Sequence, residues 1–321
     1  MYRPLVVALG LLLLAGAPAI GNDDVLCVQK ALNARGYEAG PSDGALGKRT
    51  AAAAASVAQG YQLRLPDLSE ETAAAWCEAV TALPVAQGKP VAGGVRPKGI
   101  APGLPTLIRQ RWNNAKPWGM LLVPDPVDPD NEVLRVELRY GDCGKDWYSA
   151  FDDCRNGNER VELTTDDTRF SEGSVYRFDW RLYFPESFRT VSRSADIVVG
   201  QFHYWDPAPT CCAIMFSYNG RGIDVRRLVD PASGARGVIE NLIPEAELRG
   251  RWHEIGIDVR WSNSQAGYFR IAVNGEPRYS YDGPTLSDND AYLKIGLYRL
   301  DTGPNEPPAI VFLDDIRATR R

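Results

Sequence analysis

Apolar and polar residues alternate along much of the chain after residue 104. In segment 175–184 every second residue is apolar or aromatic, and arginine or aspartate stands between them up to residue 181. The same period of two returns in segments 253–261 and 269–273, and the latter runs into Asn274-Gly275, a pair typical of tight hairpin turns. Successive side chains of a β-strand point to opposite faces, so this period predicts strands with one buried face. Residues 104–321, which show no long helical pattern, are predicted to form a mainly β sandwich or jelly roll.

The start of the chain has a different pattern. Arg3 precedes an apolar run over residues 5–15, and Ala17-Pro18-Ala19 follows as a cleavage motif of small residues. These features indicate a signal peptide, residues 1–19, because the apolar run is too short to span a bilayer comfortably. A membrane anchor is the alternative. We therefore expect an exported protein, periplasmic or secreted from a bacterium, with no membrane contact once the signal is cleaved.

Residues 23–83 are predicted to form a small three-helix domain. Apolar residues recur at helical spacing from Val25 to Leu32. The turn-forming segment 41–44 separates this helix from an alanine-rich helix that follows Thr50. A third helix is expected with Ser69 as its cap and two glutamates in its first turn.

A linker is expected between this domain and the β domain. The chain has 321 residues, a length that favours two domains. Residues 84–103 are dense in proline and glycine, and such a composition does not build a packed core. The predicted division is therefore a helical domain over 23–83, a linker over 84–103 and a β domain over 104–321.

Six cysteines in an exported chain indicate disulfide bonds. Their positions favour one pair between Cys27 and Cys77 and another between Cys143 and Cys154. The adjacent Cys211-Cys212 could form a disulfide together, pair elsewhere or stay free. A zinc site is a poor alternative because the chain has two histidines and no CxxC motif. No calcium-type acidic loop is evident, and we expect neither a cofactor nor a metal.

Two segments of the helical domain resemble a known family. They are VQKALNARGY at 28–37 and DGALGKRT at 43–50. This order, a Q-x-x-L helix, Gly-Tyr and then D-G-x-x-G-x-x-T, is similar to the peptidoglycan-binding three-helix domain. The second helix departs from the family, since SVAQ at 56–59 replaces the usual aromatic-Gln pair. The resemblance implies peptidoglycan as a partner of residues 23–83, and a spacer or docking surface is the alternative.

Three predicted strands of the β domain carry ionisable side chains on one face and apolar side chains on the other. They are segments 159–163, 199–203 and 292–298. Positions two apart share a face. The residues on the ionisable faces are Arg160 and Glu162, then Gln201 and His203, then Tyr292, Lys294 and Tyr298, with Gly296 between the last two. A solvated face is usually a mixture of Ser, Thr, Lys and Glu, so this set favours a site.

Such side chains suit β-elimination from a uronate, the carboxylate-bearing sugar of acidic polysaccharides. The proton at C5 becomes acidic only when the neighbouring carboxylate is neutralised. A base must then remove this proton, and an acid must protonate the departing glycosidic oxygen. Cationic or amide groups together with histidine and tyrosine are a sufficient set.

The same three segments carry a second resemblance. Their motifs R-x-E-L, Q-x-H and Y-x-K-x-G-x-Y, in this order, resemble the jelly-roll polysaccharide lyases that act on alginate, glucuronan and heparin. WHE at 252–254, VRWS at 259–262, Gly267, VNG at 273–275 and FLDDIR at 312–317 are similar to the heparin-lyase-like and glucuronan-lyase-like branch. The resemblance covers essentially the whole β domain. It implies a concanavalin-like jelly-roll sandwich and a lyase that releases unsaturated oligosaccharides.

The resemblance implies a role for each motif residue. Tyr298 would be the catalytic acid, and for a syn substrate also the base. His203 would be the base or help to neutralise the carboxylate, which Gln201 and Arg160 would bind. Lys294 would lower the tyrosine pKa and hold the substrate. Further substrate contacts are expected from Glu162, which would orient Arg160, and from Tyr292, Trp205, Arg135 and Arg139. Arg135 belongs to a second R-x-E-L segment, RVELR at 135–139, and Arg160 is preferred because it stands next before the Q-x-H strand.

Charge and motif content decide among the remaining functions. The net charge is −5, so binding of an acidic glycan requires positive charge that is concentrated in a cleft. The sequence has no basic stripe, which argues against nucleic acid as a ligand. A lectin-like jelly roll without catalysis would not need His203 and Tyr298 together, yet it remains the main alternative. A glycoside hydrolase needs paired carboxylates, and no E-x-D-x-x-E strand is present. A wall-associated structural protein is a further alternative. A monomer is expected.

Overall fold

The computed structural model describes thirteen stretches of the chain. They are residues 21–37, 39–61, 63–83, 85, 89–90, 118–143, 152–164, 169–190, 196–205, 211–227, 239–287, 289–300 and 306–321. The predicted signal peptide and most of the predicted linker lie outside these residues.

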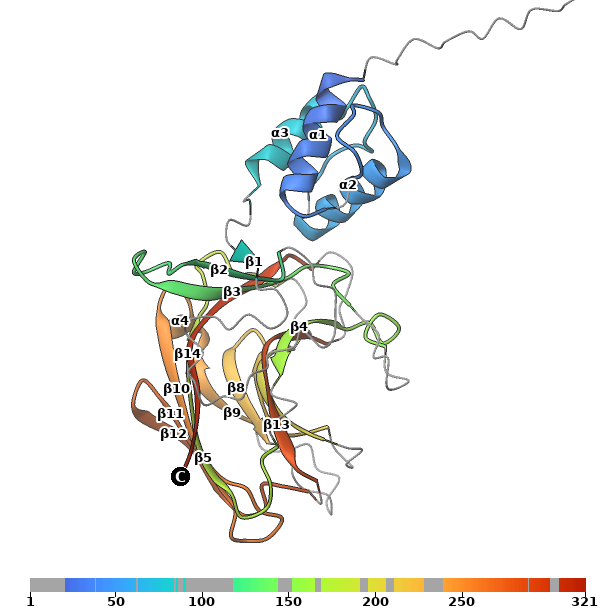
Figure 1. Ribbon diagram of the computed structural model, residues 1–321. Coiled ribbons are helices and arrows are strands. Elements are labelled where there is room, and N and C mark those ends of the chain that lie inside the picture. The colour runs from blue at the N-terminus through green and yellow to red at the C-terminus, as the bar shows by residue number, and fades with distance from the viewer. Residues whose placement is uncertain are drawn as a thin grey trace, which may run out of the picture.

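Two antiparallel sheets face each other in the β domain (Figure 1). The strands of the eight-stranded sheet are, in spatial order, β1 (Lys89–Pro90), β2 (Met120–Pro124), β3 (Glu132–Leu138), β14 (Ala309–Arg320), β5 (Val175–Tyr183), β10 (Trp252–Arg260), β11 (Tyr268–Val273) and β12 (Glu276–Asp282). Those of the six-stranded sheet are β4 (Glu159–Thr164), β13 (Ala291–Arg299), β6 (Ile197–Tyr204), β7 (Cys212–Tyr218), β8 (Gly222–Arg227) and β9 (Ile239–Pro244). The predicted jelly-roll sandwich is confirmed.

The core lies between the sheets, where the apolar faces of the strands meet. Phe178 of β5 and Phe202 of β6 belong to opposite sheets, and their ring centroids are 4.8 Å apart. Trp261 stacks on Phe170 with 5.7 Å between ring centroids. Burial of such rings contributes the largest share of apolar area in a core. Since the inner faces carry the apolar side chains, the ionisable residues of β4, β6 and β13 face away from the eight-stranded sheet.

The helical domain consists of α1 (Asp23–Ala34), α2 (Lys48–Tyr61) and α3 (Ala73–Ala82). The side chain of Asn22 caps α1 by accepting hydrogen bonds from two backbone N–H groups. The expectation that Ser69 caps the third helix is wrong. Ser69 instead bonds to Thr72 within a turn, and the helix begins one residue after Thr72. A short helix in the β domain, α4 (Glu245–Leu248), was not predicted.

The motif residues of the helical domain bond to one another. Gln29 is buried, and its amide oxygen accepts from the backbone N–H groups of Asp43 and Gly44 at 3.0 and 2.9 Å. Its amide nitrogen donates to the Ala45 carbonyl oxygen at 2.9 Å and to the Thr50 hydroxyl at 3.3 Å. The motif therefore fixes the loop between α1 and α2, which explains why its spacing predicts the fold.

All six cysteines form disulfide bonds. The structure pairs Cys27 with Cys77 and Cys143 with Cys154, as predicted. Cys211 and Cys212 pair with each other, which selects one of the three alternatives left open by the sequence. None of the helices in the described stretches is long and apolar enough to cross a membrane.

The helical domain lies against the β1–β2–β3 edge of the eight-stranded sheet (Figure 1). Arg139, just after β3, places its guanidinium 4.0 Å from the ring centroid of Trp118 and 4.7 Å from that of Tyr37. Its Nη1 donates to the carbonyl oxygen of Arg35 at 2.6 Å. Tyr37 and Trp118 also stack with 5.5 Å between centroids. One arginine thus joins the two domains.

Candidate active site

Strands β4, β13 and β6 are neighbours in the six-stranded sheet, and their register brings the predicted residues together. Tyr298 of β13 lies opposite Arg160 of β4. Lys294 of β13 lies opposite Gln201 of β6, and Tyr292 lies opposite His203. Residues directly opposite in an antiparallel pair share a face. The predicted common face is confirmed for the three strands, and we call its seven predicted residues and Asp153 the catalytic cluster.

Glu162 is the centre of the catalytic cluster. Its carboxylate accepts from Nη1 of Arg160 at 2.9 Å and from Nε2 of Gln201 at 2.7 Å. The Nζ of Lys294 lies 4.0 Å from the same carboxylate. Glu162 faces Gly296 across the β4–β13 pair. Because glycine has no side chain, Gln201 of β6 reaches the carboxylate across β13.

Asp153 holds Arg160 from the other side. The Arg160 Nε and Nη2 atoms donate to its two carboxylate oxygens at 2.9 and 3.1 Å. Both residues are buried, and a buried arginine of this kind is stable only with such paired acceptors. The guanidinium also lies 3.7 Å from the ring centroid of Tyr298. Arg160 therefore contacts two carboxylates and an aromatic ring of the protein itself. These contacts give Arg160 a positioning role and disagree with the expectation that it binds a substrate carboxylate directly.

Tyr298 keeps its proton at neutral pH. Burial raises the pKa of Tyr298 above its usual range, while the nearby Arg160 cation opposes this effect. The phenolic oxygen accepts a hydrogen bond from the Asn158 amide at 2.9 Å. The expectation that Lys294 lowers the pKa of this tyrosine is not supported, because burial raises the pKa of Tyr298 and outweighs the largest opposing cation, which is Arg160. A protonated phenol can act as a general acid.

His203 stays neutral. Loss of hydration, and then the charge of Lys294, lower the pKa of His203 to about 3. Its Nδ1 lies 2.7 Å from the carbonyl oxygen of Tyr204. A carbonyl only accepts, so Nδ1 carries the proton and Nε2 keeps a lone pair. This tautomer can act as a general base.

Aromatic residues extend the site at the His203 end. The ring centroid of Tyr292 is 5.2 Å from that of His203 and 5.8 Å from that of Trp205. Trp205 is 36% exposed, and the Arg169 guanidinium lies 3.9 Å from its ring centroid. The predicted Trp205 thus lies beside the catalytic cluster, at its exposed margin.

Arg135 and Arg139 do not join the catalytic cluster. Arg135 begins the other R-x-E-L segment, on β3 of the eight-stranded sheet, and Arg139 directly follows that segment. Each pairs with Glu137 at 2.6 Å, and Arg139 contacts the helical domain. The expectation that these two arginines bind substrate is corrected by their place in the fold, and the preference for Arg160 is supported.

Sequence reasoning missed four contributors to the site: Asp153, Asn158, Arg169 and Cys212. Asp153 and Asn158 precede β4 in a segment tied by the Cys143–Cys154 disulfide, so the predicted disulfide was a usable signal for Asp153. Cys212 lies opposite His203, and its Sγ is 3.2 Å from the Gln201 amide oxygen. Arg169 had no sequence signal, since no strand pattern includes it.

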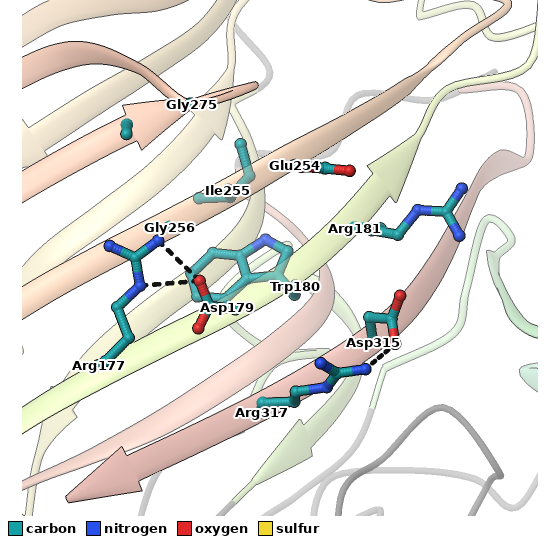
Figure 2. Close-up of a pocket in the computed structure, with 11 residues that line it drawn as sticks. Arg177, Asp179, Trp180, Arg181, Glu254, Ile255, Gly256, Gly275, Asp315 and Arg317 are labelled. Carbon is teal, nitrogen blue, oxygen red and sulfur yellow. Dashed lines mark hydrogen bonds and ion pairs between the residues drawn. The ribbon is translucent and has the colours of Figure 1, made fainter.

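A separate hollow of about 310 Å³ lies on the outer face of the eight-stranded sheet. Figure 2 shows it lined by ion-paired side chains, with Arg177 bonded to Asp179 and Arg317 to Asp315. Strands β5, β10, β11 and β14 supply the lining residues, together with Gly275 from the turn between β11 and β12. No member of the catalytic cluster lines this hollow, so it is unrelated to the cluster.

The chain was compared with known proteins. The polysaccharide lyase family model matches residues 105–317. An endo-β-1,4-glucuronan lyase from the fungus Trichoderma reesei has a TM-score of 0.49 at 15% identity, covering 71% of this chain and 95% of its own. The family 7 alginate lyase A1-II' has a TM-score of 0.46 at 13% identity, with coverages of 63% and 83%.

A third solved structure, alginate lyase PA1167 from Pseudomonas aeruginosa, has a TM-score of 0.42 at 16% identity, covering 59% of this chain and 83% of its own. Comparison with curated proteins finds no match. The family match covers nearly the whole β domain, including every residue of the catalytic cluster. This chain belongs to the polysaccharide lyase family.

Proposed function

We propose that this enzyme cleaves a uronate-containing polysaccharide by β-elimination, with His203 as base and Tyr298 as acid. The observation that carries the proposal is the position of these two residues on one face of one sheet, with Lys294 and Gln201 between them. Their environments fit the two roles, because burial lowers the pKa of His203 to about 3 and raises the pKa of Tyr298, and Nδ1 of His203 faces the Tyr204 carbonyl oxygen. The sequence left the base open between His203 and Tyr298, and the neutral imidazole favours His203.

The reaction needs one proton to leave and one to arrive. Nε2 of His203 takes the proton from C5 of the uronate. The electron pair of the C5–H bond forms the C4–C5 double bond as the bond from C4 to the glycosidic oxygen breaks. The Tyr298 hydroxyl gives its proton to that oxygen, and the Asn158 amide donates to the phenolic oxygen at 2.9 Å, which stabilises the phenolate that forms.

In this mechanism Lys294 and Gln201 neutralise the uronate carboxylate. They lie opposite each other between the base and the acid. Gln201 gives one N–H to Glu162 and has a second N–H, while Lys294 supplies a cation beside the same carboxylate. Neutralising the substrate carboxylate lowers the barrier to removal of the C5 proton, since negative charge develops there in the transition state.

Ultraviolet absorbance tests the proposal directly. Elimination creates a double bond conjugated with the carboxylate, and this group absorbs, whereas hydrolysis and binding create none. Wild type is incubated with glucuronan, alginate and heparin-type glycans beside Tyr298→Phe. We expect absorbance to rise with at least one glycan and the rise to fall about a thousandfold or more in the variant, because general acid catalysis typically supplies this order.

Tyr268→Phe is the matched control, since Tyr268 lies on β11 in the other sheet and loses the same hydroxyl. It should keep wild-type rates. If the folded wild-type protein binds these glycans without any rise in absorbance, the lectin-like alternative replaces the lyase mechanism proposed here.

We further propose that the enzyme works outside the cytosol. Three disulfide bonds support this placement, because cytosolic thiols are kept reduced. Peptidoglycan binding by the helical domain stays a prediction. The motif residues that led to it bond to one another around Gln29, and Tyr37 is buried against Trp118.

A further inference from the structure

The charges of the catalytic cluster balance. Arg160 and Lys294 contribute two positive charges, Asp153 and Glu162 contribute two negative charges, and His203 is neutral. A polymer of uronates brings one carboxylate per sugar. The cluster can receive one of them through Gln201 and Lys294, and it offers no surplus positive charge to attract the next one. Attraction of a polyanion therefore needs a cation beside the cluster.

Arg169 is such a cation. Its side chain is exposed, and among the residues that the structure describes no carboxylate forms an ion pair with it. The guanidinium lies on the Trp205 ring with 3.9 Å between Cζ and the ring centroid. Stacking on a ring fixes the plane of the guanidinium and leaves its N–H edge available to a planar anion. A carboxylate matches that fork with two parallel hydrogen bonds.

The backbone holds both members of this pair at the start of β13. Phe170, directly after Arg169, is fully buried and exchanges two backbone hydrogen bonds with Ala291, at 2.7 and 3.1 Å. The backbone N–H of Trp205 donates to the Asp290 carbonyl oxygen at 2.9 Å. Arg169 and Trp205 are thus attached to adjacent residues of one strand end, so their stacking needs little reordering when a ligand binds.

The aromatic residues connect this pair to the base. Trp205 contacts Tyr292, and Tyr292 contacts His203. Arg169 therefore lies beyond His203 in a continuous row of rings, on the side away from Tyr298. A glycan whose reacting sugar lies at His203 would extend along this row.

We propose that Arg169, stacked on Trp205, forms a subsite that binds the carboxylate of a second uronate, next to the sugar that reacts. The inference rests on the proposed function and deepens it. It requires at least two uronates close together in the substrate, and it makes Arg169 and Trp205 determinants of affinity for acidic chains.

Steady-state kinetics of Arg169→Gln test the subsite on the glycan that wild type cleaves. We expect KM to rise about tenfold, the order expected for losing a charge-assisted hydrogen bond, and kcat to change by less than about twofold, since Arg169 lies outside the catalytic cluster. KM of the variant should also depend less on salt. Trp205→Leu, which removes the support of the guanidinium, should raise KM in the same direction.

The matched control is Arg320→Gln, an exposed arginine on β14 in the other sheet. It loses the same charge and should keep the wild-type KM. Equal KM values for the Arg169 and Arg320 variants would overturn the subsite while leaving the lyase proposal intact. If wild type eliminates no glycan, equilibrium binding of the same polyuronates decides the question, since equal affinities of wild type and Arg169→Gln also overturn it.

Discussion

A histidine that stays neutral in the native protein binds fewer protons than it does in the unfolded chain. His203 is in this position, because burial and Lys294 lower its native pKa to about 3, below the value of about 6.5 expected when unfolded. Between these two values the unfolded state holds the extra proton. The free energy of unfolding therefore rises with pH in this window, and the contribution of His203 is complete above pH 6.5 and is lost as pH falls toward 3.

His203→Gln should flatten this dependence. Glutamine does not titrate, so the variant should lose less stability than wild type between pH 6.5 and pH 4, whatever its stability at pH 7. The measurement is urea unfolding at pH 7, 5.5 and 4, which gives the free energy of unfolding at each pH. Parallel curves for the two proteins would mean that His203 is hydrated and titrates normally.

At the residue scale, sequence reasoning succeeded where a strand carries the side chain. Gln201, His203 and Lys294 were placed on one face because the period of a strand is two. Arg169 and Asp153 were missed because each approaches the site from outside a strand, where no period constrains direction. The same limit explains the choice between Arg135 and Arg160, whose segments have identical spacing and differ only in the sheet to which they belong.

Among single elements, β13 departs from a regular strand at Gly296. Gly296 has a φ of 145°, and its register with β6 shifts between Ile295 and Tyr298. A Cβ at this position would lie 2.4 Å from the Val161 carbonyl oxygen and 2.9 Å from Cα of Glu162. The irregularity lies between Lys294 and Tyr298, so it sets the spacing of the residue proposed to neutralise the substrate carboxylate and the residue proposed as the acid.

Gly296→Ala should destabilise the protein by roughly 1–3 kcal/mol, the usual cost of a strained backbone position, and lower kcat by displacing Glu162 or Tyr298. Thermal unfolding and the absorbance assay measure the two effects. Gly47→Ala is the control, since nothing lies within 4 Å of a Cβ there. If the Gly296 variant melts and reacts like the control, β13 tolerates a side chain and the irregularity has no part in positioning.

The sequence predicted the strands better than their order. Alternation indicated β5, β10 and β11, and the Asn274-Gly275 turn indicated the β11–β12 hairpin. The insertion of β14 between β3 and β5 was not predictable, because this pairing joins segments more than a hundred residues apart and depends on the whole core. The alternating pattern indicates which face of a strand is buried, whereas tertiary packing decides which strand lies next to it in the sheet.

Across the whole molecule, the helical and β domains are joined more closely than the sequence implied. Proline and glycine in segment 84–103 predicted a linker between independent units. In the structure, β1 from this segment pairs with β2, and Arg139 lies between Tyr37 and Trp118. The alternative of a docking surface, left open beside wall binding, describes this contact. The spacing of residues within one domain could not reveal this contact, because each residue that forms it looks, in the sequence, like an ordinary core residue of its own domain.

The contact between domains should make their unfolding cooperative. Arg139 is 2% exposed and donates to the Arg35 carbonyl oxygen in the helical domain, so Arg139→Met removes the hydrogen bond and the cation between the two rings while keeping much of the side-chain volume. We expect calorimetry to show one transition for wild type and a separate, earlier transition of the helical domain in the variant. The rate of elimination should stay at the wild-type level, because the catalytic cluster lies on the other sheet.

Arg135→Met is the matched control for this experiment. Arg135 lies on the same strand and pairs with the same Glu137, yet no hydrogen bond joins it to the helical domain in the described part of the chain. It should lower stability without separating the transitions. A single transition in the Arg139 variant, shifted no further than in the Arg135 variant, would show that the domains are held by β1 and apolar contact instead. Separate transitions would establish that one arginine couples the helical domain to the lyase domain beside it.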